Sequence, residues 1–158
     1  MNRDILDIND FTILVEEANS EHSITDSCFF DEPVIAVAFY GSGNVHLSMK
    51  YGDKQDDYEN TKGLALSFYA DERVECIHTV SAKKPLQCLV IATSPKNLDK
   101  LPNDEGELFT DMLEQLVNPV DHYAEGPRFF MTPEKQNIVH RIIDNHYERK
   151  ATMMFFRS

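Results

Sequence analysis

Apolar and polar residues alternate along much of the first 94 positions. Phe11, Ile13 and Val15 occupy every second position, and the run Val34–Tyr40 is apolar almost throughout. Successive side chains on a strand point to opposite faces, so a period of two predicts a half-buried strand and a continuous apolar run predicts a strand covered on both faces. We expect six strands, over residues 11–15, 34–40, 45–51, 63–69, 74–80 and 86–93.

Short polar segments separate these strands. Gly41–Asn44 is a glycine-rich turn, and it predicts a hairpin between the strands on either side of it. Residues 52–60 are polar and predict a loop or an exposed hairpin end. Six short strands at such close spacing indicate an antiparallel barrel or sandwich.

The pattern changes near Ser94, beyond which apolar residues recur at helical spacing. A helix is expected over 107–117, and Thr132-Pro133 predicts the start of another, with threonine as N-cap and proline at the first helical position. The apolar stripe of this second helix consists of Ile138, Val139, Ile142 and Ile143. Residues 150–158 resemble the first turns of a further helix with no stop signal, so we expect the chain to continue in a longer protein. The division is therefore a β-domain over 1–94 and a helical segment over 95–158.

Composition narrows the classes of function. The 27 acidic residues exceed the 15 basic ones, and the formal net charge of -12 argues against nucleic-acid binding by this segment, because phosphate binding needs clustered lysine and arginine. No apolar run is long enough to cross a bilayer, and the N-terminus has no secretory pattern. Cys28, Cys76 and Cys88 are widely spaced, and the last two are expected to be buried and inert. We expect a cytoplasmic protein with no membrane partner.

The candidate chemistry is sparse. A metal-binding β-barrel enzyme of the cupin type needs a His-x-His strand with a nearby glutamate and a third histidine, and this spacing is missing. His46 and His78 lie on different predicted strands, so a metal enzyme that uses these two residues stays open as an alternative. No nucleophile elbow is present, and no cysteine has an evident neighbouring base. We therefore expect a non-enzyme without metal or cofactor.

Four aromatic pairs, among them Phe39-Tyr40 and Phe68-Tyr69, lie at strand or element ends. Adjacent strand residues face opposite sides, so each pair offers one ring to the interior, where it either packs as core or lines a pocket for a small apolar ligand. From strand position alone, the candidate pocket residues are Phe39, His46, Phe68, Cys76 and His78.

Three segments carry a resemblance to a known family. They are Phe29–Gly43 (FFDEPVIAVAFYGSG), Leu66–Glu72 (LSFYADE) and Glu125–Glu134 (EGPRFFMTPE), the last of which is followed by Met153–Ser158 (MMFFRS). The chain resembles AraC-family transcription regulators, and in particular the branch of siderophore-responsive regulators of the pyochelin type.

The resemblance implies a mainly β fold, namely a cupin-like antiparallel β-roll that binds a small-molecule effector, followed by helices that form a homodimer. The dimer interface is then expected at Ile138, Ile142, Met153 and Phe156. DNA would be contacted only through a C-terminal helix-turn-helix domain that this chain lacks. A dimerisation module without a ligand, its barrel filled by its own aromatic rings, stays open as a further alternative.

Overall fold

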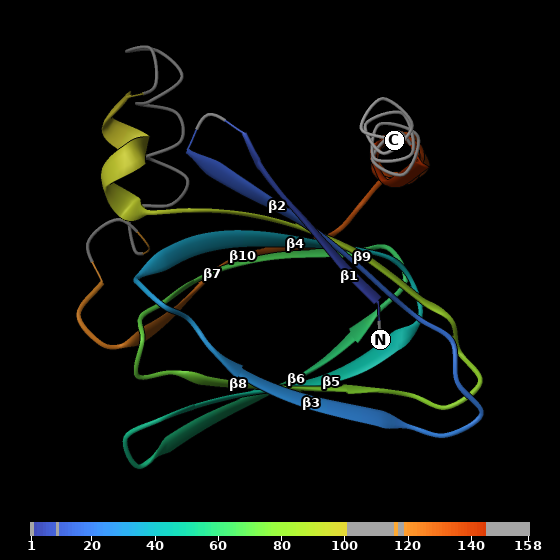
Figure 1. The fold of residues 1–158 in the computed structure, drawn as a ribbon, viewed down its shortest axis with the longest axis horizontal. Coiled ribbons are helices and arrows are strands. Elements are labelled where there is room, and N and C mark those ends of the chain that lie inside the picture. The colour runs from blue at the N-terminus through green and yellow to red at the C-terminus, as the bar shows by residue number, and fades with distance from the viewer. Residues whose placement is uncertain (1, 9, 101–115, 117–118, 145–158) are drawn as a thin grey trace, which may run out of the picture.

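A computed structural model describes residues 2–8, 10–100, 116 and 119–144, and within them ten strands form two antiparallel sheets that face each other (Figure 1). The large sheet contains, in spatial order, β1 (Asn2–Ile8), β2 (Phe11–Ala18), β9 (Leu86–Thr93), β4 (Val34–Ser42), β7 (Leu64–Ala70) and β10 (Tyr123–Phe130). The small sheet contains β3 (Ile24–Phe29), β8 (Glu75–Val80), β5 (Asn44–Tyr51) and β6 (Lys54–Thr61). A short 3-10 helix, Pro95–Lys100, follows β9.

The order of the strands identifies the architecture as a jelly roll. From β2 to β9 the chain moves back and forth between the sheets, and each of these strands pairs with strands distant in sequence, except for the β5–β6 hairpin. This arrangement is the double-sheet roll that cupins and several other classes share. The mainly antiparallel β fold with a C-terminal helix is therefore confirmed.

Both faces of the large sheet are covered. Its inner face and that of the small sheet enclose the main core, whereas a second core forms on its outer face. In β4, Ala38 belongs to the main core and the adjacent Phe39 packs against the second core. Because consecutive residues serve two cores, β4 is apolar at nearly every position, as its sequence predicted.

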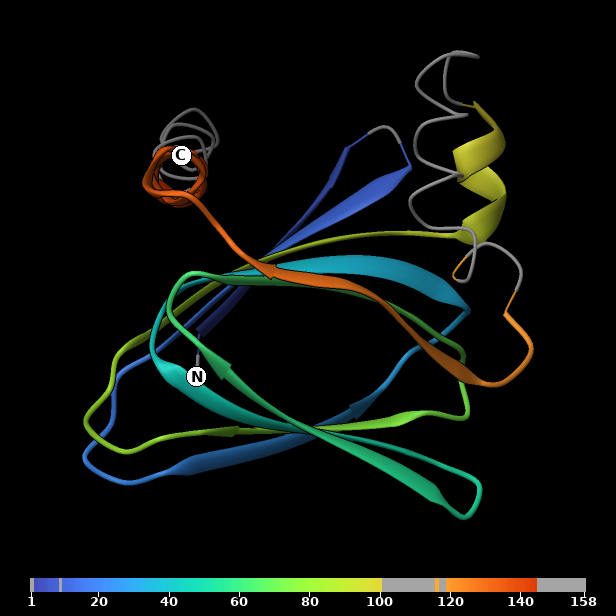
Figure 2. The ribbon, with the colours of Figure 1, turned by 180° about the vertical axis from the view of Figure 1, so that it is seen from behind.

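The second core lies beneath a helix whose described part covers 133–144 and which lies over the outer side of the large sheet (Figure 2). The helix begins where the sequence predicted: Thr132 Oγ1 accepts a hydrogen bond of 3.3 Å from the backbone nitrogen of Lys135, which identifies Thr132 as the N-cap. Val139 and Ile143 are buried against the sheet, while Ile138 and Ile142 are 48% and 38% exposed.

The predicted hairpin around Gly41–Asn44 is wrong, because β4 and β5 lie in different sheets. Gly43 has a φ of 99°, and a Cβ built on it would lie only 2.9 Å from the Cα of Leu86. The turn is thus pressed against the start of β9, and it carries the chain across the roll instead of back along β4.

The four strands that the sequence did not predict are the four sheet edges: β1, β3, β6 and β10. Residues 52–60, expected to be a loop or hairpin end, contribute most of β6. The β structure also continues past residue 94, where β10 joins the large sheet by pairing with β7.

The helix expected over 107–117 lies almost wholly outside the described residues. Within the described part of the chain, no helix is both long and apolar enough to span a bilayer.

Candidate ligand cavity

A cavity of about 360 Å³ lies between the two sheets. Its wall on the large sheet contains small side chains, including Ala36, Ala38 and Ala92, and its wall on the small sheet includes Leu47 and Met49. Three alanines on the inner face of one sheet leave space that larger residues would fill. A volume of this size lies within the ~300–1,000 Å³ range of small-molecule pockets.

A polar cluster closes one side of the cavity. Arg3 of β1 forms an ion pair with Asp26 of β3, with 2.5 Å between Nη1 and Oδ2, and its Nε lies 3.4 Å from Oε1 of Glu16. Since β1 and β3 are edge strands of different sheets, Arg3 joins the two sheets at the place where no backbone hydrogen bonds can do so.

His78 of β8 lies within this cluster, and its Nδ1 has no hydrogen-bond partner among the residues that the structure describes. Its Nδ1 is buried with no hydrogen bond and lies 3.6 Å from Oε2 of Glu16, and both residues are only 8% exposed. Burial lowers the pKa of His78 to about 4, and it raises the pKa of Glu16 against the opposing effect of Arg3. An unpartnered ring nitrogen therefore borders an apolar cavity, where a ligand could supply the missing hydrogen bond.

The cavity carries more acidic than basic groups. Among the described residues, Glu16, Asp26 and Asp31 line it, against the single guanidinium of Arg3. A buried anion would meet repulsion here, so the cavity favours a neutral or cationic ligand with a largely apolar body.

Aromatic rings close the other side of the roll. Phe68 lies on the cavity wall, with its ring centroid 6.1 Å from that of Phe30 and 6.3 Å from that of Tyr123. The Tyr123 hydroxyl donates a hydrogen bond of 2.8 Å to that of Tyr58 on β6. These contacts link β10 of the large sheet to β6 of the small one, so both open sides of the roll are bridged.

All three cysteines line the cavity, although they differ in exposure. Cys88 is buried, Cys76 is half-buried and Cys28 is exposed. Cys28 of β3 lies directly opposite Cys76 of β8 in the antiparallel register. Burial raises the pKa of the Cys88 thiol, which agrees with the inert role expected of it. Cys76 was also expected to be buried but is only half-buried, and its pairing with Cys28 was not foreseen.

The structure brings three of the five candidate pocket residues together. Phe68, Cys76 and His78 line the cavity, whereas Phe39 and His46 do not. Phe39 points outward from the large sheet, into the core beneath the helix. His46 points outward from the small sheet into solvent, because its neighbours Val45 and Leu47 take the inward positions.

His46 and His78 lie on opposite faces of the small sheet, so this pair cannot hold one metal ion. Leu47, not His46, is the register partner of His78. No group of three or more histidine, cysteine, aspartate or glutamate residues in the described ranges is arranged to hold a metal ion. The metal-enzyme alternative therefore loses the two residues on which it rested.

His46 belongs instead to a polar network on the outer face of the small sheet. Its Nδ1 is hydrogen-bonded to Glu59, which raises the pKa of His46, and its Nε2 lies 3.4 Å from Oγ of Ser48. The Ser48 hydroxyl donates its hydrogen bond to Oδ1 of Asp57 and not to His46. This serine is thus not positioned as a nucleophile activated by His46.

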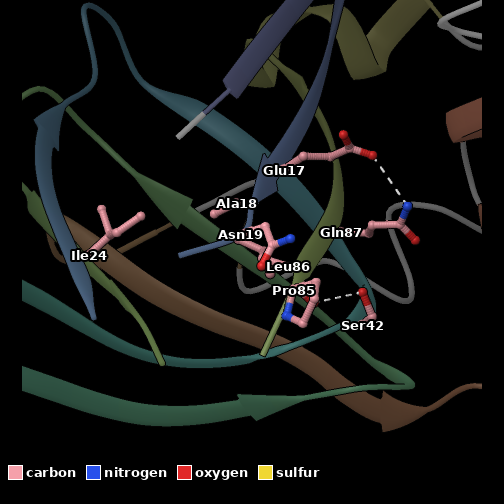
Figure 3. A pocket seen from close by; sticks show the side chains of 8 residues that line it. All are labelled: Glu17, Ala18, Asn19, Ile24, Ser42, Pro85, Leu86 and Gln87. Carbon is pink, nitrogen blue, oxygen red and sulfur yellow. Dashed lines mark hydrogen bonds between the residues drawn. The ribbon is translucent and has the colours of Figure 1, made fainter. Parts of the chain in front are cut away.

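A second hollow, of about 580 Å³, lies by the start of β9 (Figure 3). Three of its polar side chains are hydrogen-bonded within the protein: Gln87 Nε2 donates to Glu17 at 3.3 Å, and Ser42 Oγ donates to the carbonyl of Pro85 at 3.0 Å (Figure 3). The interior cavity offers an unpartnered polar atom and an apolar wall, so it is the stronger candidate.

Sequence reasoning missed the charged residues of the cavity. Arg3 and Asp26 belong to edge strands that were not predicted, and Glu16 follows the apolar positions of β2. The only signal was a charged residue at the end of an otherwise apolar alternation, which is equally typical of a strand reaching solvent.

No protein-family model and no curated protein matches the sequence. Among solved structures, ToxT from Vibrio cholerae, an AraC-family regulator, aligns with 85% of this chain and 48% of its own, at 12% identity and a TM-score of 0.53. A cupin domain from Bordetella pertussis aligns with 59% of this chain and 92% of its own (10% identity, TM-score 0.42). Vicilin from Corylus avellana aligns with 84% of this chain (14% identity, TM-score 0.45).

The likeness to ToxT concerns the fold alone, and the other two are too distant to support a shared fold. The chain spans about two fifths of the length of the vicilins it aligns with, 42% in the hazelnut protein.

Proposed function

We propose that this chain is the effector-sensing and dimerisation domain of an AraC-family transcription regulator of the pyochelin-type branch, acting in the cytoplasm. A small molecule enters the cavity between the sheets, and its binding is communicated to the helix on the outer face of the large sheet. The fold shared with ToxT supports the family assignment, and the sequence segments quoted above support the branch.

The main support for the sensing role is that neighbouring residues on the same strands face the cavity and the helix in turn. Across β2, β9 and β4, one register row lines the cavity and consists of Glu16, Cys88 and Tyr40. The adjacent row packs into the core beneath the helix and consists of Val15, Leu89 and Phe39. A ligand that displaces the inward row therefore displaces residues that touch the helix, with only the thickness of one sheet between them.

The helix also lies close enough to the sheet to respond to small shifts. A Cβ built on Gly41 of β4 would lie 3.1 Å from Cε1 of His140, and one on Gly63 would lie 3.2 Å from Nε2 of Gln136. A ligand changes the position of the helix only if it binds one arrangement of sheet and helix better than the other.

The exposed side of the helix supports the dimerisation role. Ile138 and Ile142 are about one helical turn apart and form an exposed apolar stripe directly beside the buried Val139 and Ile143. A second copy of the chain would cover this stripe. Met153 and Phe156, also expected at the interface, lie outside the described residues.

The unfilled cavity favours the sensor over a dimerisation module without a ligand. A roll filled by its own aromatic rings would leave no space, yet the rings gather at one side and about 360 Å³ remains. The acidic surplus of the lining points to a neutral or cationic effector with an apolar body.

Two dyes with related aromatic bodies test this proposal. N-phenyl-1-naphthylamine is neutral, whereas 8-anilinonaphthalene-1-sulfonate carries a negative charge, and both fluoresce in apolar sites. We expect the neutral dye to bind the folded protein more tightly than the anionic one. Ala38→Phe places a ring in the cavity and should abolish binding of the neutral dye.

Thr25→Phe is the matched control, because it adds a ring to the exposed outer face of the small sheet. This variant should bind the dye as the unmodified protein does. Cooperative thermal unfolding of both variants shows that each is folded. Undiminished dye binding by a folded Ala38→Phe variant would refute the cavity as the binding site.

A further inference from the structure

Two cysteines face each other across neighbouring strands in the cavity wall. Cys28 on β3 and Cys76 on β8 are direct partners in the antiparallel register. The Cα atoms of such partners lie ~4.5–5.5 Å apart, and disulfides span Cα separations of ~4.4–6.8 Å. The backbone therefore already holds these two residues at a separation that a disulfide requires.

The two thiols are chemically unequal. They are hydrogen-bonded to each other, and this bond lowers the pKa of Cys28 to about 7 while it raises the pKa of Cys76. A thiol whose pKa lies near the ambient pH is the most effective attacking group, because it is substantially ionised and still nucleophilic. Cys28 is thus suited to react first, with Cys76 as the hydrogen-bond donor beside it.

The exposure of Cys28 and the position of β3 at a sheet edge both favour a disulfide between Cys28 and Cys76. Cys28 is exposed, so a small oxidant reaches its sulfur, and Cys76 is half-buried next to it. In the described part of the chain β3 is an edge strand that pairs only with β8, so it can approach β8 without breaking a second ladder. Cys88 is buried in the large sheet and lacks these features.

We propose that Cys28 and Cys76 form a reversible redox modification site, which hydrogen peroxide or an organic hydroperoxide converts to a cross-strand disulfide. The Cys28 thiolate attacks the peroxide oxygen and becomes a sulfenic acid, while the O–O bond breaks and hydroxide or alkoxide leaves. The Cys76 sulfur then attacks the sulfenic sulfur, the S–S bond forms, and water leaves with the Cys76 proton. Each turnover reduces one peroxide and oxidises the two thiols.

The disulfide would form in the wall of the cavity and beside its polar cluster. β3 also carries Asp26, which holds Arg3 and so joins the two sheets. Fastening β3 to β8 would restrict the movement of this side of the cavity. The modification site rests on the register, the contact between the two thiols and the exposure of Cys28, and it does not depend on the proposed effector.

Peptide mapping tests the proposal on the full chain. Trypsin separates the three cysteines into peptides that cover residues 4–50, 74–83 and 84–96. After exposure to hydrogen peroxide without reductant, the protein should lose two hydrogen atoms, link peptide 4–50 to peptide 74–83, and regain both hydrogens with dithiothreitol. A link that involves Cys88, a dimer joined by disulfides, or irreversible sulfinic acid at Cys28 would overturn the proposal.

Serine variants separate the two roles. Cys76→Ser should leave a sulfenic acid on Cys28 that dimedone traps, Cys28→Ser should prevent oxidation of Cys76, and Cys88→Ser should form the disulfide as the unmodified protein does. If the first variant gives no dimedone adduct, the order of attack is refuted. Neutral-dye binding is measured separately on the reduced protein, so failure of the disulfide and failure of the effector site are distinguishable.

Discussion

Acidification should destabilise the protein through His78, because the folded structure disfavours the charged imidazole. His78 is buried between the sheets, its Nδ1 has no hydrogen bond, and burial lowers its pKa from 6.5 to about 4. Arg3 also disfavours the charged ring and Asp26 favours it, but burial is the largest cause. Glu16 lies 3.6 Å from His78 without reversing this outcome. No hydrogen bond joins the two residues, and the pKa of Glu16 is itself raised, which weakens its negative charge.

The magnitude follows from the two pKa values. In the unfolded chain His78 binds a proton below about pH 6.5, whereas in the folded protein it does so only below about pH 4. Between these values the unfolded state binds more protons, so stability falls as the pH is lowered. The full difference between the two pKa values corresponds to a loss of ~3 kcal/mol in the free energy of unfolding. Of this loss, ~2 kcal/mol is expected between about pH 7.5 and about pH 5.

Glu16 acts in the opposite direction. Its raised pKa means that the folded state binds a proton more readily than the unfolded chain does, so protonation of Glu16 adds stability as the pH falls toward 4.5. The pH dependence of the unmodified protein therefore contains contributions of opposite sign from His78 and Glu16. The contribution of His78 is isolated by comparing the protein with His78→Gln, which cannot titrate.

Urea unfolding, followed by circular dichroism at a series of pH values, provides the measurement. The free energy of unfolding of His78→Gln, relative to that of the unmodified protein, should rise by ~2 kcal/mol from about pH 7.5 to about pH 5. His46→Gln is the control on the other face of the sheet. The pKa of His46 is raised by Glu59, so it contributes stability at low pH and its removal has the opposite sign. A difference between His78→Gln and the unmodified protein that does not change with pH would refute the burial argument.

Two further predictions concern the sheet edges and the helix. Arg3→Gln leaves Glu16 and Asp26 without their cation and should lower the free energy of unfolding by ~2 kcal/mol near neutral pH, as measured by urea unfolding. The loss in the free energy of unfolding should be smaller below about pH 4.5, where Glu16 is protonated with or without Arg3. An equal loss near neutral pH and below about pH 4.5 would contradict this prediction. Ile138→Glu should weaken self-association in analytical ultracentrifugation and change monomer stability by less than ~0.5 kcal/mol, because Ile138 is exposed. Unchanged self-association would exclude this stripe as the interface.

The sequence by itself determined the interior of the fold. The six predicted strands are the six interior strands of the two sheets, because a strand with neighbours on both sides is buried enough to show an apolar pattern. The helix start at Thr132-Pro133 was equally clear, since an N-cap is a local hydrogen bond between residues three apart.

Only the tertiary structure decided the edges and the site. The edge strands β1, β3, β6 and β10 each have a pairing partner on one side only, so their sequences stay polar and resemble loops. The crossing from β4 to β5 depends on the contact of Gly43 with Leu86, a residue 43 positions away. Arg3, Asp26 and His78 likewise come from three different strands, and their chemistry exists only once the edges of the sheets meet.

Cys28 and Cys76 also show which features the sequence predicts and which depend on the tertiary structure. Alternation along the strand predicted that Cys76 faces inward, but its partner Cys28 is 48 residues earlier, on a strand without a clear pattern. Sequence periodicity reports which face a residue occupies, because it reflects burial along one strand. The partner of a residue depends on strand order and register, which are set by contacts between distant segments and leave no local trace.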